Sequence, residues 1–275
     1  MRWLPVLALA LASATAGAEP RASNPAFVGI KMNDLGIGCQ VADVVAGGPA
    51  RDAGVRPLDL ILTIDDAPLA QAQQGSCTTL LQKITGHAPG DIVRLQIRRV
   101  TDTVTVKVTL STRAEVLHRR FVGHRLGSAT LSDADDPRTT YELDDLRGHV
   151  TVLGWFHADT CVNCGSVFDR VRDGLRERLH GDDVPTVLAV TPTVRDPSQL
   201  RKVFTSSVKL ATAPDDAVLE GELLEPDRIH FLILDARGIV RFVSPIAPDS
   251  DDLEAALDEV LAACEQEEHA SKVRR

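Results

Sequence analysis

The stretch Cys161-Val162-Asn163-Cys164 lies between an apolar run, Val150 to Phe156, and a segment with helical spacing that begins at Val167. The run predicts a buried strand, and the spacing predicts an amphipathic helix. A Cys-x-x-Cys pair between them places two sulfur atoms at a helix N-terminus, where free N–H groups and the helix dipole favour a thiolate. The stretch therefore predicts disulfide chemistry.

The composition limits the classes of protein that come into question. The chain has 275 residues and a formal net charge of -9. This length suits two ordinary domains. Binding of phosphate groups needs clustered Lys and Arg, and the sequence has no long basic run. We therefore expect no nucleic-acid partner.

Residues 1–18 have the pattern of an export signal. A positive charge at Arg2 precedes the apolar run Trp3 to Leu11, and small residues end the segment at Ala16-Gly17-Ala18. The run is shorter than the ~20 apolar residues of a spanning helix, so we expect cleavage after Ala18. An uncleaved membrane anchor is the alternative. With cleavage, the protein is periplasmic or otherwise exported and keeps no integral membrane segment.

The first part of the chain predicts short strands with little helix. Val93, Leu95 and Ile97 alternate with polar residues, as strands that are buried on one face do. A short helix is expected over 49–54 and a longer one from Thr78 to Ile84. The fold class expected for this part is therefore mostly β.

These segments resemble a PDZ domain of the bacterial envelope type, which we place at residues 26–113. The resemblance is carried by the stretches Gly48 to Val55, Asp59 to Asp65 and Pro89-Gly90-Asp91. Leu58 stands where the family usually has Gly. The resemblance implies that the domain binds an extended peptide of a partner protein as an added strand, between a sheet edge and a helix.

The resemblance also implies where the peptide would bind. Phe27-Val28-Gly29-Ile30 matches the carboxylate-binding loop of the bacterial relatives. A glycine there lets backbone N–H groups turn toward a carboxylate without a Cβ in the way. Leu81, on the longer helix, would line the groove. The alternative is that these residues simply begin a strand in a domain that serves assembly.

The second part of the chain predicts an α/β domain over residues 127–268. Residues 114–126 are basic and mixed, and we expect a solvated linker there. Strand, helix and strand then alternate, with a tight turn at 235–238 and a last helix whose apolar face ends at Cys264. Residues 269–275 are expected to form a polar tail.

This order resembles a thioredoxin fold, and more narrowly the exported redoxins of the TlpA and AhpC-TSA type. The resemblance is carried by Thr130 to Asp133, Leu143 to Gly148, Trp155-Phe156 and the two cysteines. It implies a thiol–disulfide oxidoreductase without a cofactor that acts on a thiol or disulfide protein. Cys161 would be the nucleophile, and Cys164 would resolve the mixed disulfide.

Several positions depart from the family pattern, and among them His157 and Thr160 stand where the family usually has Trp. Trp155 stands six residues before Cys161, where thioredoxin has a buried carboxylate, and Ile229 or His230 stands where a cis-proline is expected. Asp159 is a negative charge two residues before Cys161, and it opposes the thiolate. We therefore expect no extreme oxidant.

Other interpretations of the cysteines stay open. The Cys161–Cys164 pair could be a structural disulfide in a redox-inert peptide-binding scaffold. With His157 it could instead hold copper or zinc, since this region also resembles the Sco-type copper chaperones. We assign no metal ligand. Cys39 and Cys77 could form a disulfide or be separate buried thiols, and Cys264 is expected to be buried and inert.

Overall fold

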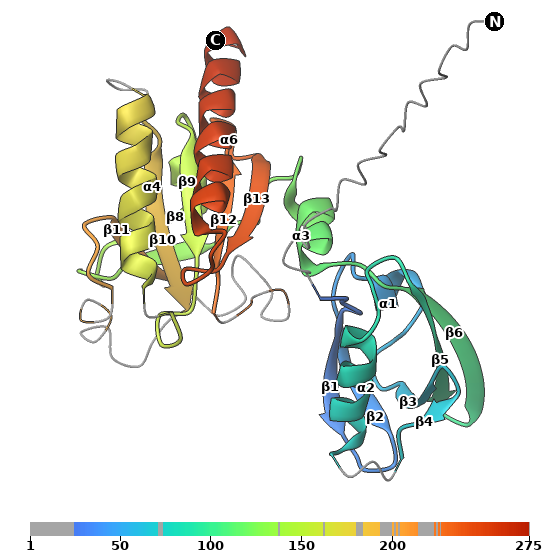
Figure 1. The fold of residues 1–275 in the computed structure, drawn as a ribbon. Helices are drawn as coiled ribbons and strands as arrows, with labels where there is room; N and C mark the ends of the chain where they lie inside the picture. Colours follow the sequence, from blue (N-terminus) through green and yellow to red (C-terminus); the bar gives the residue numbers. More distant parts are fainter. Residues whose placement is uncertain are drawn as a thin grey trace, which may run out of the picture.

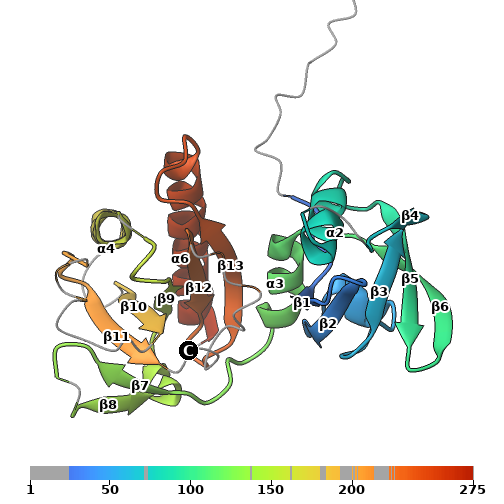
Figure 2. The ribbon, with the colours of Figure 1, turned by 90° about the horizontal axis from the view of Figure 1, so that it is seen from below.

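The computed structural model describes residues 25–70, 74–136, 138–161, 163–179, 184–192, 200, 202, 204–213, 223, 225 and 227–274. A β-rich part and an α/β part lie on either side of one short helix, α3 (Figures 1 and 2). The expected export signal lies outside the described residues and stays a prediction. Among the described residues, no helix combines the length and the apolar character that a bilayer crossing requires.

The first part is a sheet with the order β1-β2-β3-β5-β6, in which β4 pairs with β3. All its pairings are antiparallel, and its core is made by the alternating inward residues of the strands, such as Val93, Leu95 and Ile97. Its elements are β1 (Ile30–Asp34), β2 (Cys39–Val44), α1 (Pro49–Asp52), β3 (Leu60–Ile64), β4 (Ala67–Pro68), α2 (Ser76–Thr85), β5 (Ile92–Arg99) and β6 (Asp102–Thr109).

The turn before β3 explains why Leu58 matters. Its φ is +71°, a left-handed conformation, and its side chain is 75% exposed. Glycine adopts this conformation without strain, whereas a Cβ makes it cost about 1–2 kcal/mol. The turn is therefore kept although the residue that suits it is absent.

Next to this turn, Asp59 is buried and paired with Arg99. The carboxylate accepts hydrogen bonds from Nε and Nη2 of Arg99, at 2.8 and 2.7 Å, and from the Arg56 N–H at 2.8 Å. Burial alone would raise the pKa of Asp59, but these hydrogen bonds and the Arg99 charge outweigh it and hold the pKa below its ordinary value. The pair fastens β3 to the end of β5.

The second part has the strand order β13-β12-β9-β10-β11-β7-β8. β9 and β10 are parallel and joined through α4, while β12 is antiparallel to both β9 and β13. A parallel βαβ unit beside an antiparallel hairpin, followed by a helix, is the thioredoxin-like arrangement. Its elements are β7 (Thr130–Asp133), β8 (Thr140–Glu142), the 3-10 helix η1 (Leu143–Leu146), β9 (Thr151–Trp155), α4 (Cys164–Arg178), β10 (Thr186–Pro192), β11 (Lys209–Ala213), β12 (Ile229–Leu234), β13 (Val240–Ile246) and α6 (Leu253–Arg274).

Each face of this sheet has its own apolar core. Helices α4 and α6 cover one face, where Phe156, Phe168 and Phe231 pack with ring centroids 5.2–5.5 Å apart. Helix α3 (Arg113–Phe121) covers the other face together with Trp155 and Leu232. The fold is therefore the expected mostly β domain followed by an α/β thioredoxin-like domain.

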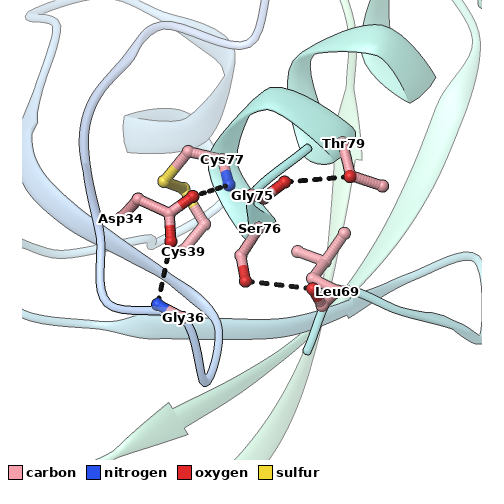
Figure 3. The surroundings of a disulfide bond; sticks show 8 residues. All are labelled: Asp34, Gly36, Cys39, Leu69, Gly75, Ser76, Cys77 and Thr79. Atoms are coloured by element: carbon pink, nitrogen blue, oxygen red, sulfur yellow. Dashed lines mark hydrogen bonds between the residues drawn. A yellow bond between two sulfur atoms is a disulfide. The ribbon is translucent and has the colours of Figure 1, made fainter. Parts of the chain in front are cut away.

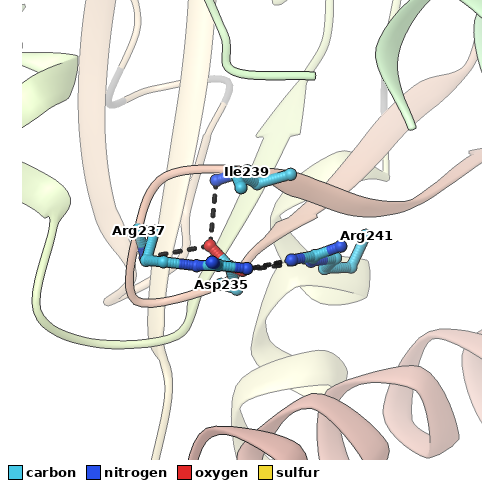
Figure 4. Close-up of polar contacts among 4 residues, drawn as sticks. All are labelled: Asp235, Arg237, Ile239 and Arg241. Carbon is cyan, nitrogen blue, oxygen red and sulfur yellow. Dashed lines mark hydrogen bonds and ion pairs between the residues drawn. The ribbon is translucent and has the colours of Figure 1, made fainter. Parts of the chain in front are cut away.

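The turn between β12 and β13 forms where the sequence predicts it, at 235–238 (Figure 4). Asp235 is 3% exposed, and its Oδ1 accepts hydrogen bonds from the N–H groups of Arg237 and Ile239. Its Oδ2 accepts from Nε and Nη2 of Arg241 at 3.0 and 2.8 Å. Gly238 completes the turn with φ +74°, which glycine adopts without strain.

The expectation of a solvated linker before the second domain is wrong. The linker 114–126 is not a solvated joint, because α3 buries Val116, Leu117 and Phe121 against the sheet. Its first turn is closed by a capping box, in which the Thr112 hydroxyl accepts from the Glu115 N–H and the Glu115 carboxylate accepts from the Thr112 N–H. The residues of the expected polar tail continue the last helix, since α6 reaches Arg274 and buries Ser271.

We expect Leu58→Gly to raise the free energy of unfolding by about 0.5–1 kcal/mol. Glycine removes the strain of the left-handed conformation, and its greater freedom in the unfolded chain offsets part of the gain. Urea denaturation measures the change. Leu58→Ala is the matched control, because it shortens the side chain but keeps a Cβ. If both variants were equally stabilised, exposure of the leucine and not the backbone would be the cause.

Candidate functional site

The two cysteines of the Cys-x-x-Cys stretch stand just beyond the end of β9. The structure joins Cys161 and Cys164 in a disulfide with 5.6 Å between the Cα atoms, within the range of ordinary disulfides. Cys164 is the first residue of α4, and Cys161 precedes the helix. Cys161 is 4% exposed and Cys164 is 1% exposed. The pair therefore stands at a helix N-terminus, as the sequence predicts, but almost covered.

Two glycines allow the helix to approach this closely. A Cβ at Gly154, the fourth residue of β9, would overlap the ring of Phe168 on α4. A Cβ at Gly165 would lie 3.2 and 3.3 Å from the backbone nitrogens of Thr205 and Ser206. The first contact sets the distance between α4 and the sheet, and the second packs the first turn of α4 against the segment before β11.

Two acidic side chains lie near the disulfide. Asp159 is exposed in the loop before Cys161, and Asp249 accepts a hydrogen bond from the Asn163 amide at 2.8 Å. The carbonyl of His157 accepts from the Cys161 N–H at 3.1 Å, so His157 holds the loop through its backbone. Asp249 comes from a distant loop, and nothing in the local sequence around the cysteines predicts it.

Trp155 and His230 occupy the opposite face of the sheet from the disulfide. They are directly paired across β9 and β12, so their side chains share a face, and Trp155 belongs to the core under α3. Both are fully buried. Burial, and then the charges of Arg228, Arg113 and His157, lower the pKa of His230 to about 3. His230 is therefore a neutral packing residue and does not stand against the cysteines.

The position of the cis-proline is occupied by ordinary backbone. Ile229 packs in the same core as Cys161 and Cys164, and the described residues contain no cis peptide bond. Pro226, the nearest proline before this strand, lies outside the described residues.

The predicted carboxylate-binding loop has backbone N–H groups that the described residues leave without an acceptor. The Phe27 N–H and carbonyl are both paired with Ser111, and the carbonyls of Val28 and Gly29 accept from Ala50 and Val45. Within the described part of the chain, the N–H groups of Val28 and Gly29 donate no hydrogen bond. Buried backbone N–H groups are rarely unpaired, so the loop has room for an acceptor.

The strand after this loop is an edge of the sheet. In the described sheet β1 pairs with β2 alone, and α2 lies beside it. Leu81 is 48% exposed, one helical turn beyond Cys77, so it faces the β1–β2 side of the helix. The edge strand β1 thus has the loop 27–30 at its start and the helix that carries Leu81 beside it.

A second disulfide closes the far end of this edge (Figure 3). Cys39, at the start of β2, is bonded to Cys77 in the first turn of α2, with 4.8 Å between the Cα atoms. Asp34, the last residue of β1, accepts from the Cys77 N–H at 3.0 Å and from the Gly36 N–H at 2.8 Å. Hydrogen bonds from Cys77, then Gly36, lower the pKa of Asp34. Helix α2 is therefore fixed to β1 and β2 at this end.

The fifth cysteine, Cys264, lies away from both disulfides. Cys264 is buried and unbonded in α6, and burial raises the pKa of its thiol, as expected of an inert residue. Among the described residues, no group of three or more His, Cys, Asp and Glu side chains is arranged to hold a metal ion.

Comparison with known families identifies the first domain. Residues 26–110 match the family model of the PDZ domain. The turn at Leu58, the free loop donors and the edge strand all lie within this match. A comparison with curated proteins found no match.

Solved structures resemble each half of the chain separately. The HtrA-type protease AlgW with a decapeptide is 21% identical over 32% of this chain and 29% of its own, with a TM-score of 0.28. This chain thus spans under a third of that protease. A putative thiol:disulfide interchange protein DsbE from Chlorobium tepidum is 18% identical over 52% of this chain and 97% of its own, with a TM-score of 0.40. BsSco, of the Sco family of cytochrome c oxidase assembly proteins, is 11% identical over 53% and 94%, with a TM-score of 0.40.

We expect the double variant Cys39→Ala/Cys77→Ala to lose about 4 kcal/mol of unfolding free energy. The disulfide joins residues separated by 38 positions, and the loss of chain entropy in the unfolded state grows with that separation. The matched control is Cys161→Ala/Cys164→Ala, whose separation is 3 and whose expected loss is about half as large. Urea denaturation of both variants decides, and an equal or larger loss in the control would contradict the expectation.

Proposed function

We propose that the chain is an exported thiol–disulfide oxidoreductase that holds a partner protein through its PDZ domain. The observation that carries the redox part is the disulfide Cys161–Cys164, which stands at the start of α4, in the connection from the inner strand β9 to that helix. Backbone N–H groups at a helix N-terminus favour a thiolate by about 0.3–1 kcal/mol. A disulfide buried only for stability has no need of that position.

The exchange would run in two steps. The Cys161 thiolate attacks a sulfur of the partner's disulfide, a mixed disulfide forms, and the partner's other sulfur leaves as a thiolate and takes up a proton. Cys164 then loses its proton and attacks Cys161, which restores the Cys161–Cys164 disulfide and releases the reduced partner. The two electrons come from the two thiols. The reverse sequence starts from the disulfide and oxidises a dithiol partner.

The roles of the two cysteines follow from their surroundings. Cys161 precedes the helix and is the more exposed of the two, so a partner reaches it first. Cys164 lies inside the first turn and packs among the apolar residues of the core. Cys161 is the more exposed cysteine, but only 4% of its surface is exposed. The loop between β9 and α4 therefore has to open slightly before a partner's sulfur can approach.

The PDZ domain would hold the partner by its C-terminus. The unpaired N–H groups of Val28 and Gly29 suit a carboxylate, and the free edge of β1 suits an added strand. Leu81 offers an exposed apolar contact on the other side of the edge. Phe27 and Ile30 frame the loop. The binding of the partner's tail would then raise the local concentration of the partner near the redox pair.

We expect Cys161→Ser to abolish disulfide reduction and Cys164→Ser to trap a mixed disulfide with the partner. Serine cannot attack a disulfide, whereas removal of the resolving thiol leaves the first step intact. Reduction of insulin disulfides in the presence of dithiothreitol measures the first, and non-reducing electrophoresis measures the second. Full activity of Cys161→Ser would contradict the assignment. An inactive wild type would favour the scaffold interpretation.

We expect Gly29→Ala to abolish peptide binding with little effect on disulfide exchange. Gly29 has φ +76°, and a Cβ there would lie 3.3 Å from Gly48 Cα and 3.4 Å from the Phe27 ring, which distorts the loop. Selection from a C-terminal peptide library yields ligands for wild type, and fluorescence anisotropy compares their affinities. Gly36→Ala is the matched control, since its Cβ would meet nothing within 4 Å despite a positive φ. Unchanged binding by Gly29→Ala would place the ligand elsewhere.

A further inference from the structure

Arg113 stands beside the carboxylate-binding loop but outside the matched PDZ region, which ends at residue 110. It is the first residue of α3, and its guanidinium carbon lies 4.8 Å from the centroid of the Phe27 ring. The same ring approaches the loop, since a Cβ at Gly29 would lie 3.4 Å from one of its carbons. The Phe27 ring therefore contacts both the cation and the loop that has unpaired N–H groups, which places Arg113 beside that loop.

The guanidinium of Arg113 has hydrogen-bonding capacity that its protein neighbours do not use. Its Nε is buried and has no hydrogen-bond partner among the described residues. Its Nη1 lies 3.6 Å from Oε1 of Glu225, an ion pair that is longer than a good hydrogen bond. A buried donor without a partner costs about 1–3 kcal/mol, so the arrangement favours an additional acceptor.

The charges around Arg113 do not balance. Glu225 is shared, because its Oε2 also lies 3.4 Å from Nε of Arg228. Two guanidinium groups thus face one carboxylate, and the three side chains are only 17–36% exposed. His230 adds no further positive charge, since burial first and the two arginines next keep its ring neutral by lowering its pKa. The group carries a net positive charge that one more carboxylate would neutralise.

We propose that Arg113 recognises the terminal carboxylate of a peptide bound in the PDZ groove, so that the first turn of α3 completes the ligand site. This proposal rests on the proposed peptide binding and names the chemistry of the ligand: a free C-terminal carboxylate, held by the N–H groups of Val28 and Gly29 and by the Arg113 guanidinium. Glu225 positions the guanidinium through the ion pair, and Phe27 positions it through the contact with its aromatic ring.

The same helix provides a matched control. Arg119 is also on α3, but its Nη1 lies 3.4 Å from Oδ2 of Asp52 on the exposed side of α1. Its ion pair faces a surface cleft of about 590 Å³, lined by residues of α1, β6 and α3, none of which belongs to the loop 27–30. Loss of Arg119 removes the same charge from the same helix without touching the loop.

The test uses the full chain and one library-derived peptide, synthesised with a free carboxylate and with a C-terminal amide. Fluorescence anisotropy gives the affinities for wild type, Arg113→Ala, Arg113→Lys and Arg119→Ala. We expect wild type and Arg119→Ala to prefer the free acid, and Arg113→Ala to bind it about 10- to 100-fold more weakly, as the loss of a charged hydrogen bond implies. Affinity for the amide should be unchanged in Arg113→Ala, which also shows that the groove is folded. Arg113→Lys should retain part of the preference.

Three other outcomes would overturn the proposal. If Arg113→Ala weakened acid and amide equally, Arg113 would act by packing alone. If wild type bound acid and amide equally, the carboxylate would not be recognised, although peptide binding itself would stand. If wild type bound no peptide from the library in either form, the proposed PDZ function would fail, and this inference would fail with it.

Discussion

The close contact between Gly154 and Phe168 determines where the disulfide stands. Phe168 is one turn inside α4, and its ring occupies the space that any side chain at position 154 would need. The ring also contacts Phe156 and Phe231, so the contact joins the helix to β9 and β12 at once. With α4 held against the sheet at this point, its N-terminus lies at the end of β9, and Cys161 and Cys164 are placed there. Close packing of this kind makes interiors intolerant of even one added methyl group.

Helix α3 holds the two domains together by close packing. Its residues Val116, Leu117 and Phe121 belong to the core on the second face of the thioredoxin-like sheet, and Val45 of the PDZ domain joins this core. Close by, the connector forms a bridge from Arg125 to Ile239 beside β13. The two domains therefore share one apolar cluster, which explains how Arg113, the first residue of α3, comes to lie near both a PDZ loop and the start of β12.

The sequence predicts those features that depend on neighbours in the chain. The strand, the Cys-x-x-Cys and the helix are successive, and the turn at 235–238 has its Asp and Gly at the positions that the turn needs. The linker does not look like a buried helix in the sequence, because its three buried apolar residues are interrupted by His118, Arg119 and Arg120 within a helix of nine residues. The Thr112–Glu115 capping box was the available signal. Asp249, Glu225 and the face taken by His230 depend on contacts between distant segments, and no local pattern specifies these.

Groups around the disulfide have opposite effects on the stability of a Cys161 thiolate. The N-terminus of α4 favours a negative charge by up to about 1 kcal/mol near the surface. Asp159 and Asp249 are both exposed, and such charges act with effects of about 0.2–1 kcal/mol each. Burial of Cys161 adds a further cost to the charged form, because the sulfur leaves water. Favourable and unfavourable contributions of similar size leave no strong net stabilisation of the thiolate. A disulfide whose reduced form is not strongly stabilised is not a strong oxidant. In the proposed redox pair, Asp159 and the Asp249 that Asn163 holds nearby would therefore limit the oxidising power that the helix N-terminus favours.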